Sequence, residues 1–372
     1  MVEPKCPYFG TCGGCTLQNT EYQYQLKDKK RYLVETLDFA DVTVHSDKEY
    51  FYRNRMDFIF HEHGIGLREK GQWSKIVDIK ECVIADERIN KLLTEIRSHF
   101  TKCDYFDVKK HTGTFRYAVI RISGKDSSIS FVLNEDSTRL AEAQDVIRAF
   151  AEKSSATNIV VTYVPAQTDV SISSEFFVIK GTDTLEADYL GKKFFYSVQG
   201  FYQNNHAMAE KMHEYVKEIV KKYDTQKMNL LDLYGGVGTF GIMNAESFKT
   251  MLTVESVKEC TDAALKNIEF NGVKNGSAQT LDAKNIRKLS LQQPLFVITD
   301  PPRSGMDEKT IAHLNLVKPK VIVYISCNVE QLKKDVPKFK EYKLTSAALF
   351  DLFPQTPHSE AVVELVLNTQ KA

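Results

Sequence analysis

From residue 228 to the C-terminus, apolar strand patterns alternate with helical patterns, and this alternation constrains the fold more than any other feature. The strand patterns cover residues 229–234, 251–255, 295–300 and 320–326. A helical pattern at 257–270 lies between two of them. Such alternation predicts a mostly parallel sheet covered by helices. The last two segments, 342–353 and 361–368, are joined by a short Pro-containing loop, which predicts an antiparallel final pair.

The preceding half of the chain has a different pattern. From about residue 50 to 198, short alternating segments are separated by glycines, and one helical pattern covers 139–153. This predicts an α+β region with an antiparallel sheet. A charged amphipathic helix is predicted at 21–37. The predicted domains are residues 1–195 and 196–372.

Composition sets limits on function. The 372 residues carry 49 basic and 49 acidic side chains, so the chain is not coated with positive charge, although a local basic groove is compatible with this balance. Lys27, Lys29, Lys30 and Arg31 form one basic cluster, or a solvated helix face. The N-terminus lacks the apolar core of a signal peptide, and no apolar run approaches the ~18 residues of a membrane span. A cytoplasmic protein without membrane association is predicted.

A glycine-rich turn follows the first strand pattern of the second half. Gly236, Gly238 and Gly241 satisfy G-x-G-x-x-G, and Glu255 ends the next strand pattern, where a carboxylate can bind ribose hydroxyls. The pattern is compatible with a nicotinamide cofactor. Two features favour S-adenosylmethionine instead. Asp232 suits the amino-acid portion of that ligand, and Asp300-Pro301-Pro302-Arg303 is an acidic loop of the kind methyltransferases place beside the transferred methyl group.

Cys327 lies where the strand pattern at 320–326 passes into a helical pattern at 329–335. The carboxyl edge of a parallel sheet is where α/β proteins bind ligands, and a helix N-terminus favours the thiolate. The alternative is a buried core cysteine. Glu360, in the loop before the last strand pattern, is placed to act as a general base at the same edge, unless it is a solvated loop residue.

The seven cysteines are unevenly distributed. Cys6, Cys12 and Cys15 crowd into the first fifteen residues, and the other four are dispersed. In a cytosolic chain, such crowding indicates metal or cluster ligation rather than disulfides. Four cysteine ligands suit either a [4Fe–4S] cluster or structural zinc, and spacing alone leaves both open.

Several motifs in order along the chain resemble the 5-methyluridine RNA methyltransferases, which methylate uracil C5 in tRNA and rRNA. They are Cys6-x5-Cys12-x2-Cys15 with Cys82, Tyr52-Arg53-Asn54-Arg55, Phe201-Tyr202-Gln203-Asn204, the glycine turn, Asp300-Pro301-Pro302-Arg303-Ser304-Gly305, Ser326-Cys327-Asn328, and Phe353-Pro354-x-Thr356-x-His358-x-Glu360. The resemblance implies a C-terminal Rossmann-like class I methyltransferase domain, with a mostly parallel sheet and an antiparallel last strand. It also implies an N-terminal and central α+β domain that carries an iron–sulfur cluster and binds RNA.

The same resemblance assigns roles to individual residues. Cys327 is implied to be the nucleophile and Glu360 the base. The implied S-adenosylmethionine contacts are Gln203, Tyr234, Glu255, Asp282 and Asp300. The implied substrate contacts are Phe201, Arg303 and His358. The implied [4Fe–4S] ligands are Cys6, Cys12, Cys15 and Cys82, with a structural or RNA-orienting role. Thr239 departs from the family pattern, where Asn is frequent, so its cofactor contact differs.

The implied chemistry explains why a nucleophile and a base are both needed. Uracil C5 is too weak a nucleophile to accept a methyl group unaided. A thiolate that adds to C6 converts the ring into an enolate, whose C5 attacks the methyl group. A base must then remove the C5 proton so that the cysteine leaves by β-elimination. The target base must also be extracted from its stack.

The cluster favours 23S rRNA as the substrate, because members that modify rRNA often carry one, and tRNA uridine 54 is the alternative. Because the sequence begins directly at the cysteines, the chain is expected to lack the small RNA-binding β-barrel domain found in many relatives. Two other functions fit parts of the sequence. One is a non-catalytic RNA-binding iron–sulfur protein, which the presence of both Cys327 and Glu360 opposes. The other is an NAD-dependent oxidoreductase, which Asp232 and the Asp300 loop oppose. No protein partner is indicated.

Overall fold

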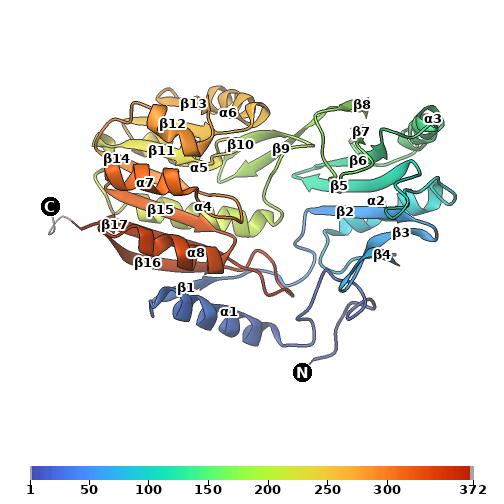
Figure 1. The fold of residues 1–372 in the computed structure, drawn as a ribbon, viewed down its shortest axis with the longest axis horizontal. Helices are drawn as coiled ribbons and strands as arrows, with labels where there is room; N and C mark the ends of the chain where they lie inside the picture. The colour runs from blue at the N-terminus through green and yellow to red at the C-terminus, as the bar shows by residue number, and fades with distance from the viewer. Residues whose placement is uncertain (1, 369–372) are drawn as a thin grey trace. The chain divides into compact units, whose positions relative to one another are not determined.

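The structure is a computed structural model that describes residues 2–368 and divides into two compact units (Figure 1). Unit 1 comprises Met1–Tyr22, Lys48–Ala187 and Tyr196–His206. Unit 2 comprises Gln23–Asp47, Asp188–Phe195 and Ala207–Ala372. The domain boundary predicted after residue 195 falls within strand β10 (Lys192–Ser197).

Unit 2 contains an eight-stranded sheet in the order β1-β16-β17-β15-β14-β11-β12-β13. The strands are β1 (Val42–His45), β11 (Asn229–Leu233), β12 (Thr250–Glu255), β13 (Gly276–Thr280), β14 (Leu295–Thr299), β15 (Val321–Ser326), β16 (Tyr342–Phe350) and β17 (Glu360–Leu367). Every pair is parallel except those of β17, which is antiparallel to both β15 and β16. The predicted parallel sheet with an antiparallel last strand is confirmed. Strand β1, which the sequence pattern did not predict, is a four-residue addition at the edge.

Helices accompany this sheet along the chain. They are α1 (Tyr22–Leu37), α4 (His206–Val220), α5 (Thr239–Asn244), α6 (Lys258–Phe270), α7 (Glu308–Val317) and α8 (Val329–Asp335), with short 3₁₀-helices η1 (Thr225–Lys227), η2 (Ala245–Ser247), η3 (Ala283–Lys288) and η4 (Val336–Lys338). Strands β11, β14 and β15 are buried at every position. Burial on both faces explains their continuous apolar sequences. Leu33 of α1, Leu314 of α7 and Leu332 of α8 belong to the same core cluster as these strands.

Unit 1 contains a seven-stranded sheet in the order β4-β3-β2-β5-β6-β7-β8. The strands are β2 (Arg55–His61), β3 (Gly64–Glu69), β4 (Gln72–Asp78), β5 (Phe115–Ser123), β6 (Asp126–Asn134), β7 (Asn158–Val164) and β8 (Phe176–Lys180). The sheet was predicted to be antiparallel, and one pair, β6 with β7, is parallel instead. The reason is α3 (Leu140–Ala151), whose crossover returns the chain in the same direction. Strands β9 (Thr184–Tyr189) and β10 form a separate pair.

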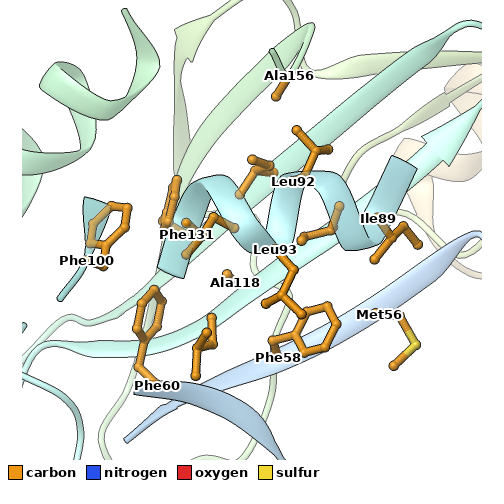
Figure 2. Close-up of a cluster of buried hydrophobic side chains, with 14 of the residues drawn as sticks. Met56, Phe58, Phe60, Ile89, Leu92, Leu93, Phe100, Ala118, Phe131 and Ala156 are labelled. Atoms are coloured by element: carbon orange, nitrogen blue, oxygen red, sulfur yellow. The ribbon is translucent and has the colours of Figure 1, made fainter. Parts of the chain in front are cut away.

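The core of unit 1 lies between its sheet and helix α2 (Glu87–His99), which begins at the N-cap Asp86. Figure 2 shows the side chains of Ile89, Leu92 and Leu93 on α2 together with Phe58 on β2. Alternate residues of β2 are buried, as expected of a strand packed on one face. Among the described residues, no helix has the length and apolar composition needed to cross a membrane.

Candidate active site and cysteine cavity

The predicted cofactor and catalytic residues of unit 2 meet at one edge of its sheet. Glu255 ends β12, whereas Tyr234, Asp300 and Cys327 directly follow β11, β14 and β15. Asp282 lies two residues beyond β13. These five strands are mutually parallel, so their carboxyl ends share an edge. This is the edge at which open α/β sheets bind ligands.

Strand pairing sets Cys327 beside Glu360. In the antiparallel pair of β15 and β17, Ser326 is opposite Ala361. Cys327, which directly follows Ser326, and Glu360, which directly precedes Ala361, are therefore adjacent. Glu360 is the first residue of β17 and only 5% exposed. It is a buried carboxyl group, not a solvated loop residue.

The surroundings of Cys327 favour the thiol over the thiolate. Burial raises the pKa of this cysteine to about 11, and the nearby carboxylates of Glu360 and Asp300 act in the same direction. Arg303 opposes them. The N-terminus of the following helix was expected to lower this pKa. Burial and the two carboxylates instead give a net rise.

Burial raises the pKa of the carboxyl groups at this edge, and a neighbouring carboxylate adds to the rise in each case. Burial, together with Asp232, raises the pKa of Asp300 to about 7. Burial and Asp300 raise the pKa of Glu360 well above its usual value. The pKa of His358 is lowered by burial and by the cations Arg303 and Lys29, which keeps its imidazole neutral. The edge therefore holds groups that can take up protons near neutral pH.

Asp232 has a different position from the one expected. Instead of pointing toward a ligand, it is fully buried, and its Oδ2 accepts hydrogen bonds from Gly241 N at 3.0 Å and Thr253 Oγ1 at 3.1 Å. A side chain at Gly235 or Gly241 would collide with this carboxylate. Gly235 and Gly241 thus leave space for the Asp232 carboxylate, which fixes the turn by its hydrogen bond to Gly241 N.

Glu255 faces the outer side of the glycine turn. Its Oε2 accepts from Gly236 N at 3.2 Å, and its Oε1 accepts from Val257 N at 2.9 Å. Gly236 has a φ of 53°, and a methyl group added there would meet no other atom within 4 Å, so the turn is open here. Asp282 is half exposed and forms an ion pair with Lys284 at 2.7 Å. These carboxylates remain accessible to a ligand, unlike Asp232.

The loop that carries Asp300 and Arg303 is anchored by Asp335 of α8. Asp335 is fully buried and accepts hydrogen bonds from Met306 N at 3.2 Å and Tyr324 Oη at 2.8 Å. Gly305 has a φ of 82°, and a side chain there would overlap Asp335 Oδ2. This explains the glycine of the Asp300–Gly305 motif as a packing requirement.

Helix α1 is bonded to the loop before Glu360 by an ion pair and two hydrogen bonds. The sequence pattern did not predict this contact. Lys29 Nζ lies 2.6 Å from Asp351 Oδ1, with both side chains almost fully buried. Gln25 donates from Nε2 to Gln355 Oε1 at 3.0 Å and accepts from Gln355 N at 3.1 Å. Gln355 has a φ of 68°, a strained conformation for a residue with a side chain. No local sequence signal marks Gln355, because the residue that holds it, Gln25, lies far away in the sequence.

Two other predicted site residues belong to unit 1. Phe201 is 67% exposed. The backbone of the segment that carries Gln203 is held by Asn54, whose Nδ2 donates to Gln203 O at 3.1 Å and whose N donates to Asn204 O at 2.9 Å. This explains the Asn of the Tyr52–Arg55 motif. The cofactor role of Gln203 and the RNA role of Phe201 stay predictions.

Cys6, Cys12, Cys15 and Cys82 line one cavity of about 600 Å³ in unit 1. Burial raises the pKa of Cys15 to about 12, and the other three cysteines act in the same direction. Gln18 lines the same cavity, and a hydrogen bond from its side chain to Cys15 opposes this rise in pKa.

Within residues 2–368, no group of three or more cysteine, histidine or carboxylate side chains is close enough to hold a metal ion. A zinc ion requires all four sulfurs at about 2.3 Å from a single point. A four-iron cluster binds its thiolates on separate irons and tolerates wider spacing. The cluster therefore stays a prediction.

Comparison with known proteins places these features in context. A family model described as tRNA (Uracil-5-)-methyltransferase matches residues 21–368. The tRNA (uracil(54)-C(5))-methyltransferase of Pyrococcus abyssi is 33% identical over 98% of this chain and 86% of its own length. An uncharacterized RNA methyltransferase of Caldanaerobacter subterraneus is 32% identical over 97% of this chain and 84% of its own length. The crystal structure of the P. abyssi enzyme with S-adenosyl-L-homocysteine matches with a TM-score of 0.82 at 30% identity, covering 97% of this chain and 86% of that one.

Proposed function

Because the chain belongs to the tRNA (uracil-5-)-methyltransferase family, we propose that it methylates C5 of uridine 54 in tRNA. The chain is an RNA uracil-C5 methyltransferase, and S-adenosylmethionine is the methyl donor that the family and the relative's bound S-adenosylhomocysteine support. The sequence alone favoured 23S rRNA. The relatives named for a substrate act on tRNA uridine 54, which favours the alternative.

The observation that carries the proposed chemistry is the pairing of Ser326 with Ala361, which sets Cys327 beside the buried Glu360. Cys327 adds to C6 of the uracil, and the resulting enolate makes C5 nucleophilic. Its thiol must first lose a proton, and Arg303 is the cation that favours this loss. C5 then attacks the methyl group of S-adenosylmethionine, and S-adenosylhomocysteine leaves. Glu360, in its ionised form, removes the C5 proton, so that the Cys327 sulfur is expelled by β-elimination.

S-adenosylmethionine would supply the methyl group at the edge formed by the ends of β11 to β14. Glu255 and Asp282 offer accessible carboxylates there, suited to hydroxyl and amino groups. Tyr234 and Asp300 follow two adjacent strands. Gln203 completes the proposed set. The neutral imidazole of His358 and the exposed guanidinium of Arg303 are proposed to contact the uridine.

We propose that Cys6, Cys12, Cys15 and Cys82 hold a [4Fe–4S] cluster. The support is the cavity that the four cysteines share. The cluster would tie the N-terminal segment to the sheet of unit 1, and the methyl transfer needs no electron from it. Phe201 lines the same cavity and, being exposed, is proposed to stack on an RNA base.

The substrate is tested by incubating the protein with labelled S-adenosylmethionine and separate tRNA and 23S rRNA transcripts. We expect 5-methyluridine in tRNA, and none in a transcript with cytidine at position 54. Methylation of 23S rRNA alone would reject the tRNA assignment. An absence of 5-methyluridine in both would reject the reaction itself.

The nucleophile is tested with RNA that contains 5-fluorouridine at the target position. Fluorine cannot leave as a proton does, so the covalent adduct should persist and shift the protein on a denaturing gel. Cys327→Ala should form no adduct, whereas Cys103→Ala, a control at a partly buried cysteine of unit 1, should form it normally. An adduct with Cys327→Ala would exclude the assigned nucleophile.

The cluster is tested by iron and sulfide analysis of protein purified without oxygen. We expect about four irons per chain and a broad absorbance band that is lost in Cys12→Ser. Cys103→Ser is the matched control, because Cys103 is partly buried in the same unit but does not line the cavity. Full iron content in Cys12→Ser would refute the ligand set.

A further inference from the structure

A second cavity in unit 1, of about 290 Å³, lies outside the sites described so far. Its walls come from β2, β3, β4, the start of β5 and the 105–109 segment. Arg68, Tyr117 and Asp169 line both this cavity and the cysteine cavity, so the two are neighbours that share a wall. Within that wall, Arg68 Nη2 contacts both carboxylate oxygens of Asp169 at 2.8 and 2.7 Å.

Two irregularities of strand pairing shape this cavity. The register of β5 shifts between Phe115 and Tyr117, so Arg116 is an inserted residue, and both Arg116 and Tyr117 line the cavity. On β4, Ile76 pairs with Arg68 but Gln72 pairs with Glu69, which leaves residues 73–75 without partners across the ladder. Trp73 and Ser74 belong to this stretch and also line the cavity. Such bulges redirect side chains and are frequent beside functional sites.

The redirected side chains include an aromatic ring and a guanidinium group, two types that bind unstacked bases in RNA recognition. Trp73 is the only tryptophan of the chain, and it is 60% exposed at the edge strand of the sheet. Arg116 is 3% exposed and lies over the ring of Phe106 at 4.2 Å. Its Nε has no partner among the described residues. A buried guanidinium N–H without an acceptor is costly, and an acceptor atom of a ligand in the cavity would satisfy it.

We propose that this cavity binds one base of the substrate RNA other than the methylated uridine. The base stacks on Trp73 and accepts a hydrogen bond from Arg116 Nε. The volume lies near the lower limit of small-molecule pockets, about 300 Å³, which suits one nucleotide unit rather than a duplex. Single-stranded RNA is recognised by such aromatic stacking and edge hydrogen bonds. This proposal rests on the proposed function, because it takes RNA as the substrate.

The single tryptophan gives a direct test. Titration of the cluster-containing protein with an unmodified tRNA transcript should quench Trp73 emission with the same midpoint as an independent filter-binding assay. Trp73→Ala should weaken RNA binding about 5- to 150-fold, the range expected for one base–aromatic stack. Trp73→Phe should restore most of it. The melting temperature should stay unchanged in both, since the side chain is exposed.

The matched control is Phe270→Ala, an exposed aromatic at the end of α6 in unit 2, which should bind RNA like the wild type. Saturable RNA binding without a change in Trp73 emission, and with Trp73→Ala at wild-type affinity, would overturn the proposal. Failure of the proposed function has a separate signature: wild-type protein would form no 5-methyluridine in the same transcript.

Discussion

Substituting Lys29 by Met should destabilise unit 2 strongly, because it leaves a buried carboxylate without its ammonium partner. Lys29 Nζ and Asp351 Oδ1 are 2.6 Å apart, and the two side chains are 5% and 0% exposed. Lys29 Nζ also lies 3.3 Å from Phe353 O. The substitution keeps the length of the aliphatic side chain, so the change is one of charge and hydrogen bonding.

The magnitude has an upper limit set by protonation of Asp351. A carboxyl with an ordinary pKa near 3.9 takes up a proton at pH 7 at a cost of about 4 kcal/mol. Breaking a buried pair by removing one partner costs about 3–5 kcal/mol, so the two estimates agree. At pH 5 the protonation limit falls to about 1.5 kcal/mol. The destabilisation should therefore shrink by more than half between pH 7 and pH 5.

The assay is urea unfolding followed by circular dichroism at both pH values, together with the rate of 5-methyluridine formation. Because Asp351 begins the loop that leads to Glu360, the catalytic rate should also fall, while the Michaelis constant for S-adenosylmethionine changes little. Lys29→Met/Asp351→Asn removes both charges and should recover much of the lost stability. Lys30→Met, at an exposed position of the same helix, is the control and should behave like the wild type.

Two results would refute the reasoning. One is a destabilisation by Lys29→Met below about 1 kcal/mol at pH 7, which would mean that water or another group solvates Asp351. The other is a destabilisation that is the same at pH 5 and pH 7, which would show that the cost does not come from a buried carboxylate.

Three further predictions concern the catalytic edge. Gly305→Ala should lower the melting temperature and the methylation rate, since its φ of 82° and the nearby Asp335 leave no room for a side chain; an unchanged melting temperature would contradict this. Burial raises the pKa of Asp300 to about 7, so the folded state binds its proton more tightly, and stability falls as pH rises from about 4 to about 7. Asp300→Asn should remove this part of the pH dependence, as measured by melting temperature from pH 4.5 to 8. With the pKa of Cys327 raised to about 11, kcat/KM for RNA should rise with pH between 7 and 9; a flat profile would contradict the raised pKa, because kcat/KM reports the groups of the free enzyme.

The sequence predicted the sheet of unit 2 because its strands are buried on both faces and appear as short apolar runs with β-rich composition. It also placed Tyr234, Glu255, Asp300 and Cys327 at one edge, because residues that follow parallel strands must meet there. Local periodicity was sufficient for both. The parallel direction of β7 was missed, although the helix that causes it was predicted.

The sequence could not reveal contacts between residues that lie far apart in the chain and meet only in the fold. Lys29 belongs to a cluster of basic residues and has no local sign of being buried; its partner is 322 positions away. Asp232 was assigned to a ligand because it follows the pattern of a strand end, yet its carboxylate points inward. The pKa of Cys327 was expected to fall because of the helix N-terminus, whereas burial, Glu360 and Asp300 raise it; the burial depends on the folded surroundings, which the local pattern does not show.

The antiparallel insertion of β17 also bears on how this fold can change in evolution. The separation between Cys327 and Glu360, the proposed nucleophile and base, is set by the ladder between β15 and β17, not by the length of the loop at 351–359. Insertions at the exposed Pro357 and His358 would therefore change the surface of this loop while the two side chains keep their alignment. A single residue inserted within β17 would instead turn the strand over and direct Glu360 to the opposite face of the sheet.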